Sequence, residues 1–171
     1  MGIYGYKSFS PDGKNINGAL FVPGVVYTVP GKAHFGTKGN GYHFALRLED
    51  TLLFRENPDE RTSDYVIAYV YGDGDIAEGE SGQGTFEDLY VATRLTVIKY
   101  LSRKEIIQYA LSLPPYRMLR FVSYFRLKSD EIALFIGKDE NVDCAINYYQ
   151  LGVEDAYTRR YTRPYKSKRP H

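Results

Sequence analysis

Cysteine is nearly absent from this chain of 171 residues, because Cys144 is the single one. One cysteine cannot form an intramolecular disulfide, so a disulfide-stapled secreted scaffold is excluded. The N-terminus also lacks a basic segment followed by an apolar one, which is the pattern of a secretory signal. We therefore expect a protein that is not secreted.

Long apolar runs and tryptophan are missing too. A membrane-spanning helix needs about 20 apolar residues, and even the apolar stretch 89–101 contains charged residues, so we expect a soluble protein. Aromatic residues are nevertheless abundant, with 17 Tyr and 9 Phe but no Trp. Tyrosine offers a large apolar ring and a hydroxyl that needs a partner, which suits half-buried and interface positions. A tyrosine-rich core is the alternative interpretation.

The net charge of +1 hides an uneven distribution. Residues 159–171 hold six Lys and Arg and no acid, which leaves 16 basic against 21 acidic residues in positions 1–158. The body is therefore mildly acidic and the end of the chain is basic. Together with 43% hydrophobic and 25% charged residues, this composition is that of one globular domain with an appendage.

The first part of the chain has the alternation of half-buried strands. Turn-forming residues separate the segments, as in Ser10-Pro11-Asp12-Gly13 after the first one. The segment 64–71 stops at Gly72-Asp73-Gly74-Asp75, and we expect it to pair with 89–101. A short amphipathic helix is expected at 48–54, ended by Asn57-Pro58. The expected strands lie at residues 3–9, 19–29 (a pair broken by Pro23-Gly24), 42–46, 64–71 and 89–101.

After Leu101 the period of the apolar residues becomes helical. The capping-box sequence 102–105 opens a helix at 106–113, which Pro114-Pro115 stops. Further helices are expected at 116–127, at 131–136 with Ser129-Asp130 as cap, and at 142–151 with Asp139 or Asn141 as cap. These patterns predict an α+β fold: a mostly antiparallel sheet with one short helix, then three to four short helices. We expect a single domain at 1–153, sheet-rich over 1–101 and helical over 102–153, followed by a tail at 154–171.

Motifs for phosphate and calcium binding are incomplete. The glycines at 79, 82 and 84 lie between acids and lack the lysine that ends a phosphate-binding loop. Asp73, Asp75 and Glu78 match half of a calcium loop, but its later ligands are missing, so a solvated turn is the better interpretation.

Zinc and thiol chemistry find little support either. His34, His43, Cys144 and His171 share no ligand spacing. Cys144 stands beside Ala145 and Ile146 in an expected helix, where a thiol usually acts as a small apolar side chain. We therefore expect no metal, no cofactor and no cysteine nucleophile.

Three short motifs carry a resemblance to a known group of domains. They are Tyr6-Lys7-Ser8-Phe9, then Gly41-Tyr42-His43-Phe44-Ala45 before a helix, then 66–76 ending in a Gly-Asp turn. In this order they resemble an uncharacterised small domain of phages and large DNA viruses, with a Tyr-Lys-Gly-Phe start and a Gly-Phe-His-Phe-Cys centre. Ser8 and Ala45 depart from that pattern, and the similarity covers roughly residues 3–107. The resemblance implies a viral origin and no activity.

A more distant similarity in motif order concerns ADP-ribosyltransferase cores. Lys7 would take the place of the basic residue on the first strand, Tyr42 with His43 the aromatic segment, and Glu87 the late carboxylate. This resemblance implies an NAD-binding enzyme in which the carboxylate stabilises the oxocarbenium ion. A lysine in the first place weakens it, since a point charge does not hold ribose as arginine or histidine does. The alternative is that His43 is structural and Glu87 belongs to a solvated loop.

The basic end of the chain decides the main functional hypothesis. Its composition cannot build a core, so alone we expect it to be extended. It suits binding to an acidic groove of a protein neighbour, or to phosphates and bases of a nucleic acid. We expect a non-enzymatic minor virion component of a large DNA virus, located in the virion or host cytoplasm, with an enzyme or a nucleic-acid-binding accessory protein as alternatives. The expected binding residues are Arg159, Arg160, Tyr161, Arg163, Tyr165, Lys166, Lys168 and Arg169.

Overall fold

The computed structural model describes residues 1–9, 20–36, 38–54, 66–79 and 88–152. Within these ranges, five antiparallel strands and four α-helices confirm the predicted α+β class. The chain divides into two compact units. The described residues of the strand-rich unit lie within Met1–Phe54 and Asp64–Ser102, and those of the helical unit lie within Arg103–His171. That both belong to one domain stays a prediction.

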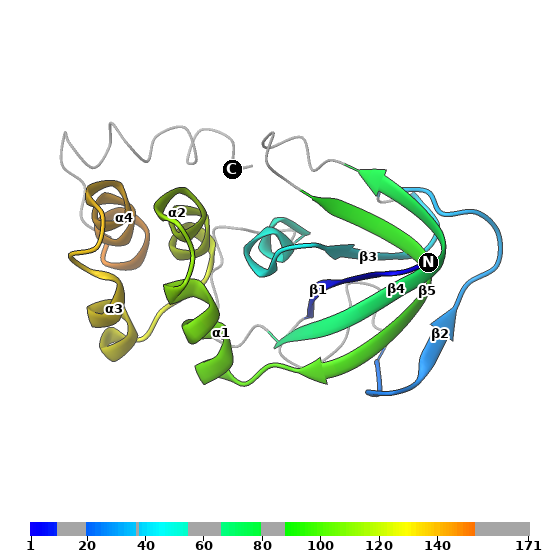
Figure 1. Ribbon diagram of the computed structural model, residues 1–171. Coiled ribbons are helices and arrows are strands. Elements are labelled where there is room, and N and C mark those ends of the chain that lie inside the picture. The colour runs from blue at the N-terminus through cyan, green and yellow to red at the C-terminus, as the bar shows by residue number, and fades with distance from the viewer. Residues whose placement is uncertain (10–19, 37, 55–65, 80–87, 153–171) are drawn as a thin grey trace. The chain divides into compact units, whose positions relative to one another are not determined.

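The strand-rich unit is dominated by two long curved strands, β4 and β5, that run side by side (Figure 1). Their pairing confirms the one predicted from the sequence. A short 3-10 helix, η1, follows the third strand. The elements of this unit are β1 (Ile3–Phe9), β2 (Val26–Thr28), β3 (Tyr42–Ala45), η1 (Leu48–Phe54), β4 (Val66–Gly79) and β5 (Leu89–Tyr100).

Four of the strands pair in a closed cycle. β1 pairs with β4, β4 with β5, β5 with β3, and β3 with β1 through the Tyr6 and Ala45 pair. β2 pairs with β5 beyond the end of β3. Because successive side chains of a strand point to opposite faces, the cycle has an inner and an outer face.

Aromatic and aliphatic side chains fill the inner face. Phe44 at its centre is fully buried, and a Cβ added to Gly72 would lie 2.6 Å from its ring. A glycine is needed there because the phenyl ring occupies the space of a side chain. The core cluster consists of Phe9, Phe21, Phe44, Ala68, Val70, Ala92, Leu95 and Val97. This core accounts for the alternating pattern of the strands.

The prediction that the strand expected at 64–71 stops at Gly72 was wrong. β4 continues to Gly79, and the pairing with β5 shifts register between Asp73 and Ile76. Gly74 adopts φ 77°, which a residue with a side chain rarely takes, and the Asp75 amide donates to Thr93 Oγ1 at 2.9 Å. The Gly-Asp sequence thus makes a bulge inside a strand, where turn chemistry suggested an end.

Two other expected elements differ in detail. Within the described part of the strand pair expected at 19–29, residues 20–29, β2 is the one strand, and Gly24 at φ 83° makes a tight turn before it, closed by the Val25 amide and the Val22 carbonyl. The short helix at 48–54 is present with the predicted bounds, as a 3-10 helix. Its Thr51 carbonyl accepts a hydrogen bond from Ser8 Oγ at 2.9 Å, which fixes η1 against β1.

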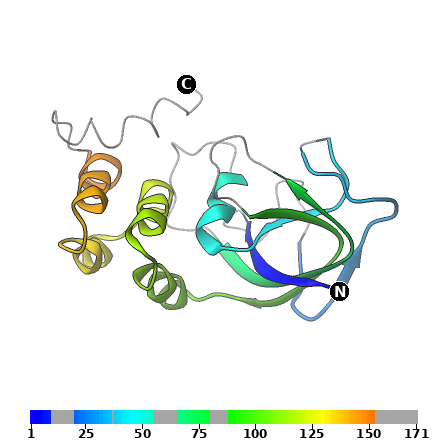
Figure 2. The ribbon, with the colours of Figure 1, turned by 45° about the horizontal axis from the view of Figure 1, so that its top comes forward.

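The helical unit confirms a run of short helices (Figures 1 and 2). Within it α2 packs against α4 and η2, and the buried ring of Phe121 stacks on those of Phe125 and Phe135, with centroids 4.8 and 5.9 Å apart. Pro115 begins α2. The amide hydrogen that proline lacks would have no hydrogen-bond partner within the first turn of a helix, so proline is tolerated there. The elements are α1 (Arg103–Leu111), α2 (Pro115–Tyr124), α3 (Ser129–Phe135), α4 (Glu140–Ala145) and the π-helical turn η2 (Ile146–Gln150).

One predicted cap is confirmed and another is wrong. Asp139 caps α4, since its Oδ1 accepts from the amides of Asn141 and Val142 at 2.9 and 3.1 Å. For α3 the sequence pointed to Ser129 and Asp130. The helix instead begins at Ser129, and the Glu131 carboxylate accepts from the Lys128 amide at 2.7 Å.

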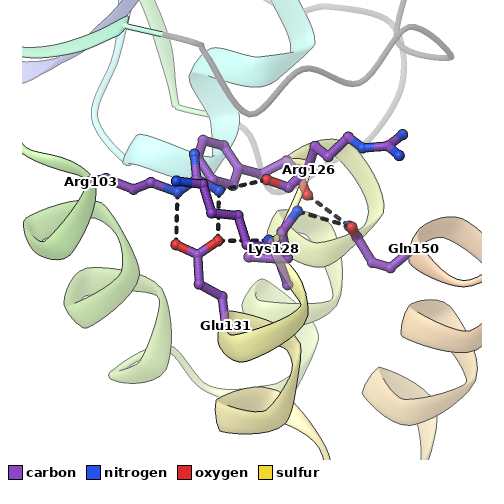
Figure 3. A network of polar contacts seen from close by, with 7 residues as sticks. Arg103, Arg126, Lys128, Glu131 and Gln150 are labelled. Carbon is purple, nitrogen blue, oxygen red and sulfur yellow. Dashed lines mark hydrogen bonds and ion pairs between the residues drawn. The ribbon is translucent and has the colours of Figure 1, made fainter.

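A polar network joins the first and third helices of this unit (Figure 3). Arg103 Nε and Nη2 donate to the two oxygens of Glu131, both at 2.7 Å, and Nη2 also donates to the Arg126 carbonyl at 2.9 Å. The Arg103 guanidinium lies 5.0 Å from the centre of the Phe125 ring. A bidentate pair of this kind fixes both side chains and so fixes where α3 starts.

Gln150 completes the network at the C-terminal end of α2. The predicted helix 142–151 changes to η2 at Ile146, where the Leu151 amide donates to the Ile146 carbonyl. Gln150 Nε2 donates to the carbonyls of Val122 and Phe125 at 2.6 and 2.7 Å. The last carbonyls of a helix lack intrahelical donors, and this side chain supplies them.

Candidate functional site

Four tyrosines lie together on the outer face of β1 and β4. The strand register places Tyr4 opposite Tyr71 and Tyr6 opposite Tyr69. Each strand contributes a Tyr-x-Tyr pair, so alternation puts all four rings on the same side of the sheet. We call these residues the tyrosine face.

The rings of the tyrosine face contact one another. The ring of Tyr4 stacks on that of Tyr69, with centroids 5.6 Å apart, and lies 4.7 Å from that of Tyr71. Tyr6 and Tyr69 are 5.4 Å apart. Tyr4 is nevertheless 54% exposed, and the other three are half-buried. The cluster is therefore ordered by its own contacts and still reaches solvent.

The same outer face continues onto the next two strands. Tyr71 lies opposite Thr96 of β5, which lies opposite Val26 of β2. One row of side chains thus crosses four strands, from Tyr4 to Val26. The tyrosines occupy one end of this row and an exposed aliphatic side chain the other.

Charges of both signs border the tyrosine face. Lys99 lies opposite Tyr69, and Arg94 lies 3.6 Å from Asp73, which offsets its charge. Burial, the neighbouring Tyr69 and Glu49 raise the pKa of Tyr6, so its hydroxyl is protonated at neutral pH. The face therefore offers aromatic area and hydroxyl groups and has little net charge.

Lys7 and His43 are brought together by β1 and β3. Lys7 lies on the inner face and is 8% exposed, and its Nζ donates to the His43 carbonyl. The imidazole lies 4.8 Å from the ring of Phe35, and its Nε2 accepts from the Gly36 amide at 3.0 Å. Burial and the nearby Lys7 lower the pKa of His43 to about 4, so the ring is neutral at physiological pH.

The other residues of the transferase hypothesis do not join this pair. Tyr42 points to the opposite side of β3 from His43, where its ring contacts Phe21 at 5.6 Å. Burial and the neighbouring Tyr27 raise the pKa of its hydroxyl. Glu87 lies outside the described residues. The Lys7 and His43 contact has a structural explanation, and the transferase activity stays an untested alternative.

The expected binding residues of the tail, from Arg159 to Arg169, also lie outside the described part of the chain. In the part that is described, no group of three or more His, Cys, Asp and Glu side chains is placed to hold a metal ion. Asp75 accepts a hydrogen bond from the Ala33 amide at 2.7 Å, and Cys144 is buried in α4. The fold therefore accounts for the places of Asp75 and Cys144 without a ligand.

Comparison with known proteins gives no neighbour. No protein-family model, curated protein or solved structure matches this chain. Within the described ranges, no helix is long and apolar enough to cross a membrane.

Sequence reasoning missed the tyrosine face as a set of residues. The spacing Tyr4-x-Tyr6 and Tyr69-x-Tyr71 was visible in two expected strands, and period-two spacing puts each pair on one side of its strand. The pairing of β1 with β4 was not predicted. Without that pairing, nothing joins the two halves of the cluster.

Proposed function

We propose that this protein is a non-enzymatic assembly protein that docks onto a neighbouring protein subunit through its tyrosine face. The observation that carries the proposal is the cluster of four mutually contacting tyrosines that remain partly exposed on β1 and β4. Tyrosine is enriched where protein interfaces gain most of their affinity, because a rigid ring buries much area at a small entropy cost.

The charges favour a protein over a nucleic acid as the occupant of this face. Nucleic-acid binding depends on several cations that neutralise phosphates. Here Lys99 borders the tyrosines, and Arg94 has the carboxylate of Asp73 beside it. The partner surface that fits is largely apolar and carries hydrogen-bonding groups for the tyrosine hydroxyls.

The basic tail adds a second contact to this proposal. Its cations and tyrosines, from Arg159 to Arg169, are suited to an acidic groove on the same or an adjacent subunit. An extended segment that orders on binding can span a large surface at modest affinity. With the resemblance of Tyr6-Lys7-Ser8-Phe9 and Gly41–Ala45 to a domain of large DNA viruses, these features support a minor, capsid-associated virion component.

The test is to map neighbours in the particle from which the protein comes. A photo-crosslinking amino acid replaces Tyr4 in one variant and Tyr116 of α2, which is 61% exposed, in a matched variant. We expect the Tyr4 position to link to one defined site on a structural subunit, and the Tyr116 position to give no link to that site. Equal, scattered labelling by both variants, or links to nucleic acid from position 4, would overturn the docking proposal.

A second test measures the Kd for binding to the subunit that the crosslinking identifies. Tyr4→Ala removes an exposed ring whose loss leaves the inner core intact. An aromatic residue at the centre of an interface contributes about 2 kcal/mol, so we expect a Kd about 30-fold higher. Tyr116→Ala is the control and should leave the Kd unchanged.

A further inference from the structure

A different surface of the strand-rich unit is the outer edge of β2. The register pairs Val26, Tyr27 and Thr28 with β5 on one side. Among the described residues, no strand pairs with the opposite side of β2. A strand edge of this kind presents backbone groups to whatever approaches it.

The hydrogen-bond pattern shows which groups these are. The Val29 amide donates to the Thr93 carbonyl at 2.9 Å, so residue 29 belongs to a hydrogen-bonded pair with β5. In antiparallel strands such pairs alternate with pairs whose amides and carbonyls point away. The amides and carbonyls of Val26 and Thr28 therefore point to the open edge.

This short edge lacks charged side chains, which are one of the features by which proteins protect a strand edge. Charged side chains on an edge strand prevent pairing with other chains, yet residues 25–29 read Val-Val-Tyr-Thr-Val without a charge. Val26 is 49% exposed, and Val25 and Ile98 beside it are also exposed. An uncharged edge flanked by exposed aliphatic side chains favours the addition of a strand.

We propose that β2 pairs with β2 of a second copy of this chain, as two antiparallel strands related by a two-fold axis at Tyr27. Val26 of each copy then lies opposite Thr28 of the other. The open amides and carbonyls of both residues exchange hydrogen bonds, and the exposed Val26 side chain packs on the Thr28 methyl group across the edge.

Two features of the sequence favour a second copy over an unrelated strand. The edge is self-complementary, because the same pair of residues supplies donors and acceptors in both directions, and no charge opposes their approach. Pro23 and Pro30 bracket the segment, and proline cannot donate to a ladder. The pairing is therefore short and closed, and using both edges leaves none for growth into a fibre.

Disulfide trapping of the full chain tests the register directly. Opposed residues of an antiparallel pair have Cα atoms about 5.5 Å apart, within disulfide range. The two Val26 residues would be about 8 Å apart, since they are offset by two positions along the strands. We expect a mixture of Val26→Cys and Thr28→Cys proteins to cross-link at least tenfold faster than either alone under mild oxidation. Wild type, in which Cys144 is buried, is the blank.

Sedimentation of the uncross-linked protein is the second measurement. We expect a concentration-dependent dimer whose Kd rises at least tenfold in Val26→Lys, because like charges and lysine chains replace the apolar contact. Leu134→Lys on α3, where the leucine is equally exposed, is the matched control and should leave the dimer unchanged. A protein that stays monomeric at all soluble concentrations, a dimer insensitive to Val26→Lys, or equal cross-linking of mixed and single variants would overturn the proposal.

Discussion

His43 makes the stability of the strand-rich unit depend on pH in a way that can be isolated. Its imidazole is half-buried between β3 and Phe35, and its Nε2 accepts a hydrogen bond from the Gly36 amide. That bond requires an unprotonated nitrogen. Protonation in the folded state is opposed by burial and by Lys7, which lower the pKa from 6.5 to about 4. Acid should therefore weaken the fold through this residue.

The sign and size of this pH effect follow from the pKa of His43 in the unfolded chain, 6.5, and in the folded chain, about 4. Between pH 6.5 and about 4, the unfolded chain binds a proton at His43 that the folded chain does not, so stability falls as pH falls through this window and levels off below it. The full pKa difference corresponds to about 3.4 kcal/mol. Because the imidazole is partly exposed, solvent screens its surroundings, and we expect roughly 1.5 kcal/mol.

The assay compares wild type with His43→Gln, whose amide oxygen can accept from Gly36 and does not titrate. For each protein, urea titrations give the change in unfolding free energy between pH 7 and pH 4. Carboxylates titrate in both proteins, so the difference between these two changes isolates the contribution of His43. We expect wild type to lose about 1.5 kcal/mol more than the variant. Proton NMR of the folded protein gives the pKa itself. Titration of His43 near pH 6.5, with parallel stability curves, would refute the reasoning.

Three further predictions concern other parts of the fold. Glu131→Gln should lower the free energy of unfolding by about 2 kcal/mol at pH 7, since it leaves a guanidinium without its carboxylate, while Asp130→Asn changes it by less than about 0.5 kcal/mol in the same urea titration. Gly72→Ala should cost about 1–3 kcal/mol, measured by thermal unfolding, because the new methyl group meets the ring of the buried Phe44. Asp139→Ala should cost about 1 kcal/mol by the same measurement, and equal stability would show that α4 needs no cap.

Periodicity and local chemistry predicted much of the fold. β1 shows the expected alternation, and Asp139 caps α4 because a carboxylate there reaches two free amides. Such features depend on neighbours within a few residues. The proline pair 114–115 separates α1 from α2 for the same reason, since its effect on the backbone is local.

The remaining features depend on contacts between segments far apart in the chain. Gly72-Asp73-Gly74-Asp75 has the composition of a turn, and only pairing with β5 turns it into a bulge. η2 places Gln150 under carbonyls more than 20 residues away. The tyrosine face requires the register between β1 and β4, which two separate Tyr-x-Tyr patterns do not contain.

A row of outward side chains connects the two proposed surfaces. A two-fold axis between antiparallel β2 strands stands perpendicular to the sheet at β2, so the outer sides of the two β2 strands point the same way. The row from Tyr4 through Tyr71 and Thr96 ends at Val26, where the second copy would begin. A dimer would thus carry two tyrosine faces related by the two-fold axis. Because a second contact then forms at a high effective concentration, weak docking by each face adds up to tight attachment on an array of identical subunits.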